Sequence, residues 1–398
     1  MSVTAAAGFR AAGINAGLKE SGRLDLALVV NDGPLDVAAG VFTTNRVAAA
    51  PVRWCRGVLG GEHDAMGSAR AVILNSGSAN ACTGPRGAAD TAATAVRVAE
   101  LLSEDHPGLQ ADDVLVCSTG VIGVPLDMPV LLAGAEAAAR ALDTTAEAGH
   151  DAAVAIMTTD TVPKEDALHL DGWSIGGMIK GVGMLAPGLA TMLCVITTDA
   201  VIDASTAGSA LSRAAARTVN RINSDGCMST NDTVLLLASG ASGITPNPDD
   251  FDAAVEELLA RLGRRLVADA EGATHDIAIT VTGAISEAAA EAAARTVSAS
   301  NLLKCAVAGE DPNWGRVISQ LGTVPEAVCP FDPDAVDVAI NGVTVFRHGE
   351  LGEDRSTVDM TPRETRIDIA LGAGDAAATV WTNDLTHGYV TINADYTT

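Results

Sequence analysis

Residues 179–200 read IKGVGMLAPGLATMLCVITTDA, and this stretch joins two kinds of local structure. Glycines and a proline in its first half predict a loop. The apolar and β-branched residues at 192–198 predict a buried strand. Thr191 stands at the junction, directly after Ala190. A loop that runs straight into a buried strand is a place where a hydroxyl group can be held on a constrained backbone.

Strand-like and helix-like segments alternate on both sides of this stretch. We expect strands at 24–30, 71–74, 114–117, 192–198, 233–237, 277–282, 336–340 and 367–371. We expect helices at 91–102, 129–142, 207–222, 251–270 and 287–297. Turns at Asp171-Gly172 and Asn341-Gly342 add antiparallel hairpins. The pattern predicts an α/β (α+β) fold, with a smaller strand-rich part at about 330–398 that closes on the active site.

Composition narrows the class of protein. The chain has 398 residues, 48% of them apolar, which excludes disorder. Its 25 basic and 50 acidic side chains give a net charge of −25, so nucleic acid and anionic membranes are poor partners. The seven cysteines form no CxxC pair, so we expect neither disulfides nor a metal site. No signal-like or membrane-spanning run is visible, and we expect a cytoplasmic protein.

Two short matches to catalytic motifs lack the structural context that their chemistry needs. Gly172–Gly176 matches the G-x-S-x-G nucleophile motif, but its surroundings predict a hairpin instead of a strand followed by a helix. The glycines of 181–186 resemble a dinucleotide fingerprint, but Pro187 and Gly188 follow where a helix should begin. We reject both motifs.

Thr191 has a route to becoming a nucleophile. A threonine hydroxyl is weak unless a base takes its proton, and the α-amine of an N-terminal threonine is such a base. That amine has a pKa near ~8. An internal threonine reaches this state by attacking the preceding carbonyl, and the small Ala190 leaves room for the attack. The alternative is an ordinary strand threonine after a loop.

The stretch resembles the self-processing signature of the ornithine acetyltransferases of arginine biosynthesis, K-G-x-G-M-x-x-P-x-x-A-T-M-L. The resemblance extends over most of the chain. It includes NSGSANAC at 75–82, CSTGVIG at 117–123, MTTDTVPK at 157–164, STNDT at 229–233, DPNWGR at 311–316 and NADYTT at 393–398. Seven blocks in this order are highly specific. The resemblance implies a DmpA/ornithine-acetyltransferase-like fold of mixed β-sheets layered with helices.

The resemblance also implies roles for individual residues. Cleavage falls between Ala190 and Thr191, giving an α-chain of residues 1–190 and a β-chain of residues 191–398. Thr191 becomes the nucleophile, and the Thr119 hydroxyl and the Gly120 amide form the oxyanion hole. The substrate-binding residues that the resemblance implies are Thr158, Lys180, Thr191, Glu271, Asn393 and Thr398. From the residues alone, Lys180 is equally well a solvated loop charge, and Glu271 a solvated residue at a helix end.

The implied activity moves an acetyl group from N-acetylornithine to glutamate through an acetyl-Thr191 intermediate. No cofactor is expected, and whether acetyl-CoA also serves as a donor is left open. The expected assembly is a heterotetramer of two α- and two β-chains. Two alternatives stay open: an N-terminal-nucleophile amidohydrolase or aminopeptidase of the same architecture, and an uncleaved binding protein without activity.

Overall fold

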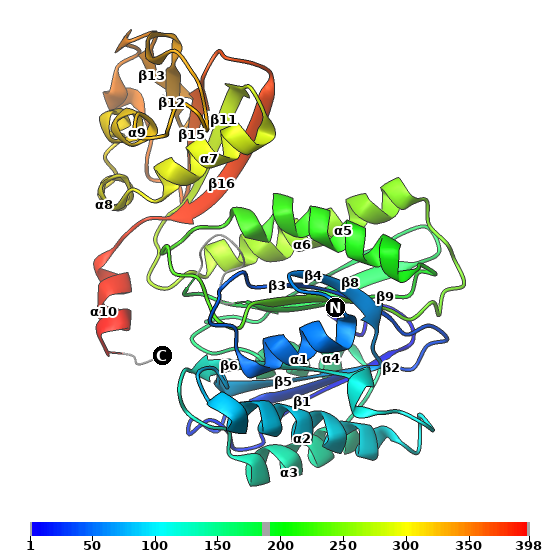
Figure 1. Cartoon of the computed structure of the whole chain (residues 1–398). Coiled ribbons are helices and arrows are strands. Elements are labelled where there is room, and N and C mark those ends of the chain that lie inside the picture. Colours follow the sequence, from blue (N-terminus) through cyan, green and yellow to red (C-terminus); the bar gives the residue numbers. More distant parts are fainter. Residues whose placement is uncertain (1, 185–191, 396–398) are drawn as a thin grey trace.

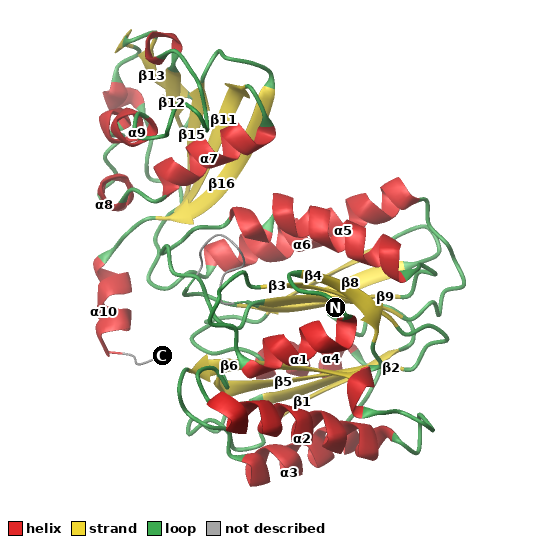
Figure 2. Cartoon of the chain, viewed as in Figure 1, coloured by secondary structure: helices red, strands yellow, loops and turns green. Residues whose placement is uncertain are grey.

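The computed structural model describes residues 2–184 and 192–395, which form three β-sheets with helices between and around them (Figures 1 and 2). The first sheet contains β1 (Phe9–Ile14), β2 (Leu26–Asn31), β5 (Ala71–Ser78) and β6 (Val114–Val121), in that order. The second runs β4 (Asp64–Ser68), β3 (Val37–Phe42), β10 (Thr233–Ala238), β9 (Leu193–Thr198), β8 (Ser174–Lys180) and β7 (Lys164–His169). The expected α/β class is confirmed.

These two sheets alternate with helices in a layered body (Figure 2). Helices α1 (Ala50–Leu59) and α4 (Ala146–Ala155) lie between the sheets, and their apolar sides share one core with both. Helices α2 (Gly84–Leu102) and α3 (Met128–Arg140) cover the outer face of the first sheet. Helices α5 (Ala204–Arg217) and α6 (Pro248–Ala268) cover the outer face of the second. Each sheet is therefore buried on both faces.

Burial on both faces explains why the central strands β9 (Leu193–Thr198) and β10 (Thr233–Ala238) are mostly apolar. Every residue of β9 and β10 is buried, and the two strands pair in parallel. On its other side β9 pairs antiparallel with β8. Residues 181–192 therefore join two neighbouring strands of the sheet. The hairpin expected at Asp171-Gly172 is confirmed as the β7–β8 turn.

The third sheet belongs to a C-terminal unit that stands against the body (Figure 1). Its order is β14 (Glu350–Leu351), β13 (Val343–Arg347), β12 (Asp337–Ile340), β15 (Glu364–Ala370), β11 (Asp276–Ala284) and β16 (Ala376–Asn383). Three helices pack against it in a common core: α7 (Glu287–Ser298), α8 (Asn301–Ala308) and α9 (Trp314–Leu321). The unit begins with β11, before the expected boundary at about 330, because β11 pairs with both β15 and β16.

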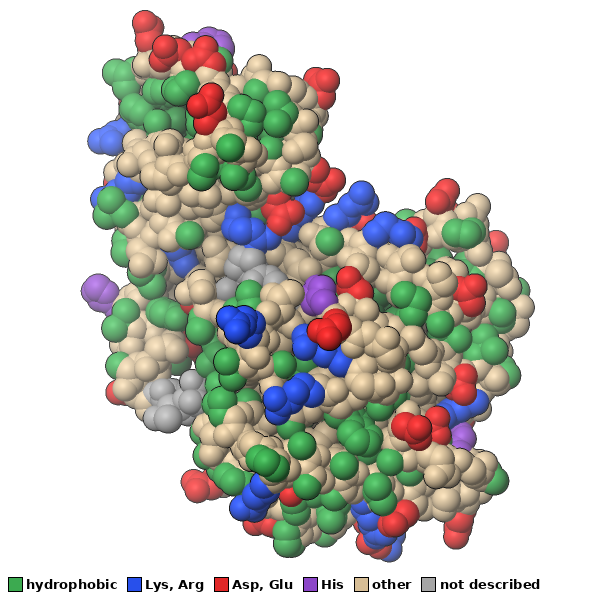
Figure 3. Space-filling model, viewed as in Figure 1, with side chains coloured by type: hydrophobic (Ala, Val, Ile, Leu, Met, Phe, Trp, Pro, Cys, Tyr) green, Lys and Arg blue, Asp and Glu red, His purple; other side chains and the backbone are tan. Residues whose placement is uncertain are grey.

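The unit is joined to the body by ion pairs as well as by chain connections. Arg221 lies 2.5 Å from Glu287 at the start of α7, and Arg217 lies 4.0 Å from the same carboxylate. Figure 3 shows basic side chains gathered along this junction on one face. One expected helix, 207–222, is shorter than we expected: α5 ends at Arg217, where the hydroxyl of Thr218 bonds back to the Ala214 carbonyl and a 3₁₀ turn follows.

After β16 the chain returns to the body as helix α10 (His387–Asp395), which has no buried residue (Figure 1). Within the described residues, no helix combines the length and the apolarity needed to cross a membrane.

Candidate active site

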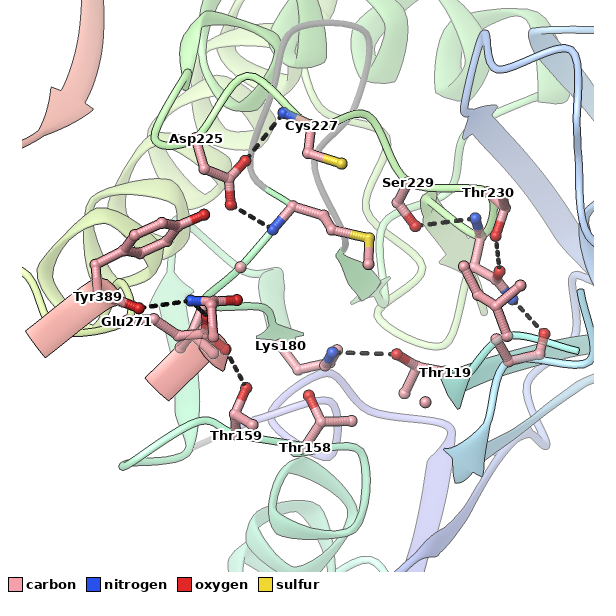
Figure 4. A pocket seen from close by; sticks show the side chains of 18 residues that line it. Thr119, Thr158, Thr159, Lys180, Asp225, Cys227, Ser229, Thr230, Glu271 and Tyr389 are labelled. Carbon is pink, nitrogen blue, oxygen red and sulfur yellow. Dashed lines mark hydrogen bonds between the residues drawn. The ribbon is translucent and has the colours of Figure 1, made fainter. Parts of the chain in front are cut away.

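A cavity of about 190 Å³ opens where β6 and β8 end, between the body and α10 (Figure 4). Its walls come from segments far apart in the sequence. The lining residues are Ala79, Thr119, Gly120, Ile122, Thr158, Thr159, Lys180, Val182, Gly183, Met184, Asp225, Cys227, Ser229, Thr230, Asn231, Glu271, Tyr389 and Asn393. Six predicted site residues are thus brought together: Thr119, Gly120, Thr158, Lys180, Glu271 and Asn393. The other predicted positions, Ala190, Thr191 and Thr398, lie outside the described residues.

Thr119 and Gly120 lie near the end of β6, where the strand pairs irregularly with β5. Thr119 is buried, and its side chain faces the cavity (Figure 4). Gly120 has φ 130°, and a Cβ atom there would lie 2.3 Å from the carbonyl carbon of Gly77. Only glycine fits this backbone and this close approach. The position suits a backbone amide that must come close to a ligand.

Lys180 ends β8 with its side chain buried in the cavity wall, at 1% exposure. Its Nζ donates a hydrogen bond of 3.1 Å to Thr119 Oγ1. Among the described residues, no carboxylate oxygen lies within 4.0 Å of this ammonium. Burial lowers its pKa, and nearby Asp160 only partly opposes that effect. Lys180 is therefore not the solvated loop charge that the sequence also allowed.

Behind Lys180 lies a group that we call the ion cluster: Lys164, Asp160 and Asp269. Lys164 Nζ is 2.6 Å from each of the two carboxylates, and its side chain is completely buried. Asp160 also accepts the amides of Thr158 at 3.0 Å and Gly181 at 2.8 Å. Burial alone would raise the pKa of Asp160, but the Lys180 and Lys164 ammonium groups outweigh it and lower the pKa to about 2. Through these two amide hydrogen bonds, Asp160 fixes the backbone at Thr158 and at Gly181, next to Lys180, and both segments carry cavity residues.

Glu271 faces the cavity from the turn after α6 and is held by neutral donors. Its Oε1 accepts the Thr159 hydroxyl at 2.8 Å, and its Oε2 accepts Asn393 Nδ2 at 2.9 Å. Its own amide donates to the Val182 carbonyl at 3.0 Å. The hydrogen bond from Asn393 ties helix α10 to this wall. Glu271 is therefore fixed in the site and is not a freely solvated helix end.

The structure adds two aspartates that the sequence analysis did not single out. Asp225 accepts the amides of Met184 at 2.6 Å and Cys227 at 3.0 Å. Asp232 is fully buried, and its Oδ1 accepts the amide of Met192 at 3.0 Å, next to the predicted nucleophile position. Burial raises the pKa of both carboxyl groups. In the sequence, Asp232 could have been noticed because it lies in the family-like block STNDT at 229–233. A turn-like Asp-Gly pair was the only local signal for Asp225.

Comparison with known proteins now identifies the relatives of this chain. Residues 10–398 match the model of the ArgJ family. The chain is 61% identical over 399 residues to the arginine biosynthesis bifunctional protein ArgJ of Bifidobacterium longum, and both chains are covered completely. It is 57% identical over 396 residues to the protein of the same name from Streptomyces coelicolor, again with complete coverage of both.

Two solved structures are also similar to this chain. The crystal structure of ornithine acetyltransferase complexed with ornithine from Mycobacterium tuberculosis is 56% identical, with a TM-score of 0.45, and the match covers 48% of this chain and 96% of that chain. The arginine biosynthesis bifunctional protein ArgJ from Bacillus halodurans is 33% identical, with a TM-score of 0.47, covering 50% and 97%. By its family-model match and by its identity to full-length relatives, the chain belongs to the ArgJ family.

Proposed function

We propose that this protein transfers an acetyl group from N-acetylornithine to glutamate in arginine biosynthesis, through an acetyl ester on Thr191. The observation that carries the proposal is the cavity that brings together the Thr119 hydroxyl, the Gly120 backbone, the buried Lys180 ammonium and the Glu271 carboxylate. Membership of the ArgJ family and the names of its relatives point to the same activity. These features complement the substrate group by group: the ammonium of Lys180 suits its carboxylate, the Thr119–Gly120 pair suits its N-acetyl group, and the carboxylate of Glu271 suits its distant ammonium.

In the first half-reaction, the α-amine of Thr191 takes the proton of its own hydroxyl, and the oxygen attacks the acetyl carbonyl. The Thr119 hydroxyl and the Gly120 amide donate to the oxyanion. Because Lys180 donates to Thr119 Oγ1, the hydroxyl hydrogen of Thr119 stays available for the oxyanion. The C–N bond then breaks, the proton passes to the leaving α-amine, and ornithine departs from an acetyl ester.

In the second half-reaction, the neutral α-amine of glutamate attacks the same ester. The bond to Thr191 breaks, the proton returns to the threonine oxygen, and N-acetylglutamate leaves. The Thr191 α-amine serves as the base again. Lys180 binds the substrate carboxylate and Glu271 binds the distant ammonium of ornithine, with Thr158, Asn393 and Thr398 completing the site.

Self-cleavage between Ala190 and Thr191 fits the topology of the second sheet. The two products would remain interlocked, since β8 from the first segment pairs with β9 from the second, and β3 pairs with β10. The amide of Met192, tied to Asp232, would anchor the new chain start from its second residue. We further propose an assembly of two α- and two β-chains, to be checked by native mass spectrometry.

The test has two parts. Denaturing electrophoresis and N-terminal sequencing should show a second chain that begins at Thr191 in the wild type, one full-length chain in Thr191→Ala, and restored cleavage in the matched variant Thr191→Ser. Labelled N-acetylornithine should yield labelled N-acetylglutamate only when glutamate is present. Acetate release that is independent of glutamate would indicate a hydrolase instead. The same assay with acetyl-CoA as the sole donor decides whether the enzyme is bifunctional.

A further inference from the structure

A second cavity, of about 230 Å³, adjoins the first on the side of the C-terminal unit. The two cavities share a wall of four residues. The full lining is Val182, Ser224, Asp225, Ala270, Glu271, Asn301, Lys304, Asn383, Asp384, Leu385 and Tyr389, of which Val182, Asp225, Glu271 and Tyr389 also line the first cavity. Pockets for drug-sized ligands measure roughly 300–1,000 Å³, so this one suits a ligand the size of an amino acid.

Lys304 lines the second cavity from helix α8, and only 5% of its surface is exposed. Its Nζ donates to the Ser224 carbonyl, which is its one hydrogen-bond acceptor among the described residues. Across residues 2–184 and 192–395, no carboxylate oxygen lies within 4.0 Å of it. An ammonium carries three donors. Burial lowers the pKa of Lys304, and an anion bound in the cavity would reverse that effect.

Asp225 lines the same cavity with the opposite charge. Its two oxygens accept backbone amides, and no cationic nitrogen of the described part of the chain lies within 4.0 Å of it. Asp384, in contrast, accepts the amide and hydroxyl of Thr274 and contacts His275. The cavity is therefore lined by a cation, Lys304, and by two anions, Asp225 and the shared Glu271, that are held only by neutral groups among the described residues. Asp225 and Lys304 are not paired with each other.

We propose that the second cavity binds a free α-amino acid, with its carboxylate on Lys304 and its α-ammonium on Asp225. A zwitterion satisfies both charges at once, whereas an N-acetylated amino acid has no α-ammonium to offer. This assignment rests on the proposed function, in which the acceptor is a free α-amino acid. The second cavity would hold that acceptor before it reaches the acetyl ester. The four shared lining residues place the two cavities next to each other, so the acceptor would have only a short distance to move.

Separate measurement of the two half-reactions tests the inference. In Lys304→Met, the KM for glutamate should rise about tenfold, because a charge-assisted bond is lost. The burst of ornithine released from N-acetylornithine without glutamate should stay within about twofold of the wild type. Lys304→Arg should recover part of the affinity for glutamate. Arg316→Met is the matched control, because Arg316 also donates to a backbone carbonyl, that of Leu302, but does not line the cavity.

Equilibrium binding supplies an independent readout. Calorimetry with glutamate and with N-acetylglutamate should show that Lys304→Met loses affinity for the free amino acid far more than for the acetylated one. If Lys304→Met does not fold, Asn301→Asp keeps the lysine and places a carboxylate in the cavity, and it should weaken glutamate binding in the same way. An unchanged KM and affinity for glutamate in a folded variant would overturn this inference alone. Failure of the wild type to acetylate glutamate would instead overturn the proposed function.

Discussion

Two neighbouring regions of the second sheet each bury a lysine. In one region the ammonium is paired with carboxylates, and in the other it has no carboxylate partner within 4.0 Å among the described residues. In the ion cluster at the start of β7, Lys164 touches two carboxylates at 2.6 Å. In the cavity at the end of β8, the one hydrogen bond of Lys180 Nζ within the described residues goes to the Thr119 hydroxyl, at 3.1 Å. Burying an ammonium is costly unless it is paired. The paired lysine therefore fits a structural role, whereas the lysine without a carboxylate partner in the described residues fits the ligand-binding role proposed above.

The largest effect should come from breaking the ion cluster. Lys164→Met leaves Asp269 buried without its ion-pair partner and Asp160 with only the more distant Lys180 charge, so the free energy of unfolding should fall by about 3–5 kcal/mol. Urea unfolding at pH 7 measures it. The matched control is Arg261→Met, which removes an exposed pair with Glu257 and should cost less than about 1 kcal/mol. Equal losses in the two variants would show that the cluster is not structural.

On the cavity side, Thr119→Ala should leave stability near that of the wild type but lower kcat by about 10²–10³. The reason is that the hydroxyl donates to charge that develops only in the transition state, so KM should change much less. Steady-state kinetics and unfolding curves check both statements, and Thr119→Ser should retain most of the activity. A near-normal kcat in Thr119→Ala would remove Thr119 from the oxyanion hole.

Lys180→Met sharpens the contrast with Lys164 directly. The KM for N-acetylornithine should rise about tenfold or more, because the substrate carboxylate loses a charged donor. The free energy of unfolding should fall by less than in Lys164→Met, because Lys180 makes no ion pair within 4.0 Å among the described residues and acts on Asp160 only from a longer distance. A large loss of stability would place Lys180 with the scaffold instead.

The ion cluster should also appear in the pH dependence of stability. The pKa of Asp160 falls from its usual 3.8 to about 2 in the folded protein. A lowered carboxyl pKa stabilises the fold above the unfolded value and loses that contribution as pH falls through the folded value. The contribution, about 2 kcal/mol, should therefore be present at pH 5 and lost towards pH 2. The gap in unfolding free energy between the wild type and Asp160→Asn should narrow over that window.

The smallest effect is expected at helix α10, which borders the cavity without buried contacts. Asn393→Ala removes the donor to Glu271 and should raise the KM for N-acetylornithine about two- to tenfold. Thr391→Ala is the matched control, because the hydroxyl of Thr391 donates to the His387 carbonyl within α10 and has no other partner among the described residues. Deleting 393–398 should also raise the ratio of acetate to N-acetylglutamate. If the KM and the product ratio are both unchanged, α10 does not contribute to substrate binding.

Much of the fold could be predicted from the sequence. Runs such as 233–237 are almost entirely apolar, which is typical of strands covered on both faces, and the alternation with helices indicated the class. Most of the predicted site residues could be named because the family-like blocks carry them, whereas Glu271 lies in none of these blocks and was named only from the resemblance as a whole. Their roles remain predictions, and the cleavage site itself lies outside the described residues.

Local sequence determined which segments become strands and helices, because periodicity and turn residues act within a few residues of one another. It could not distinguish Lys164 from Lys180, since both are single lysines near strand ends. Only the tertiary structure decided that one meets Asp269 across more than a hundred residues of chain, while the other faces a cavity. The partners of a buried charge come from distant segments, and their positions depend on how the layers pack.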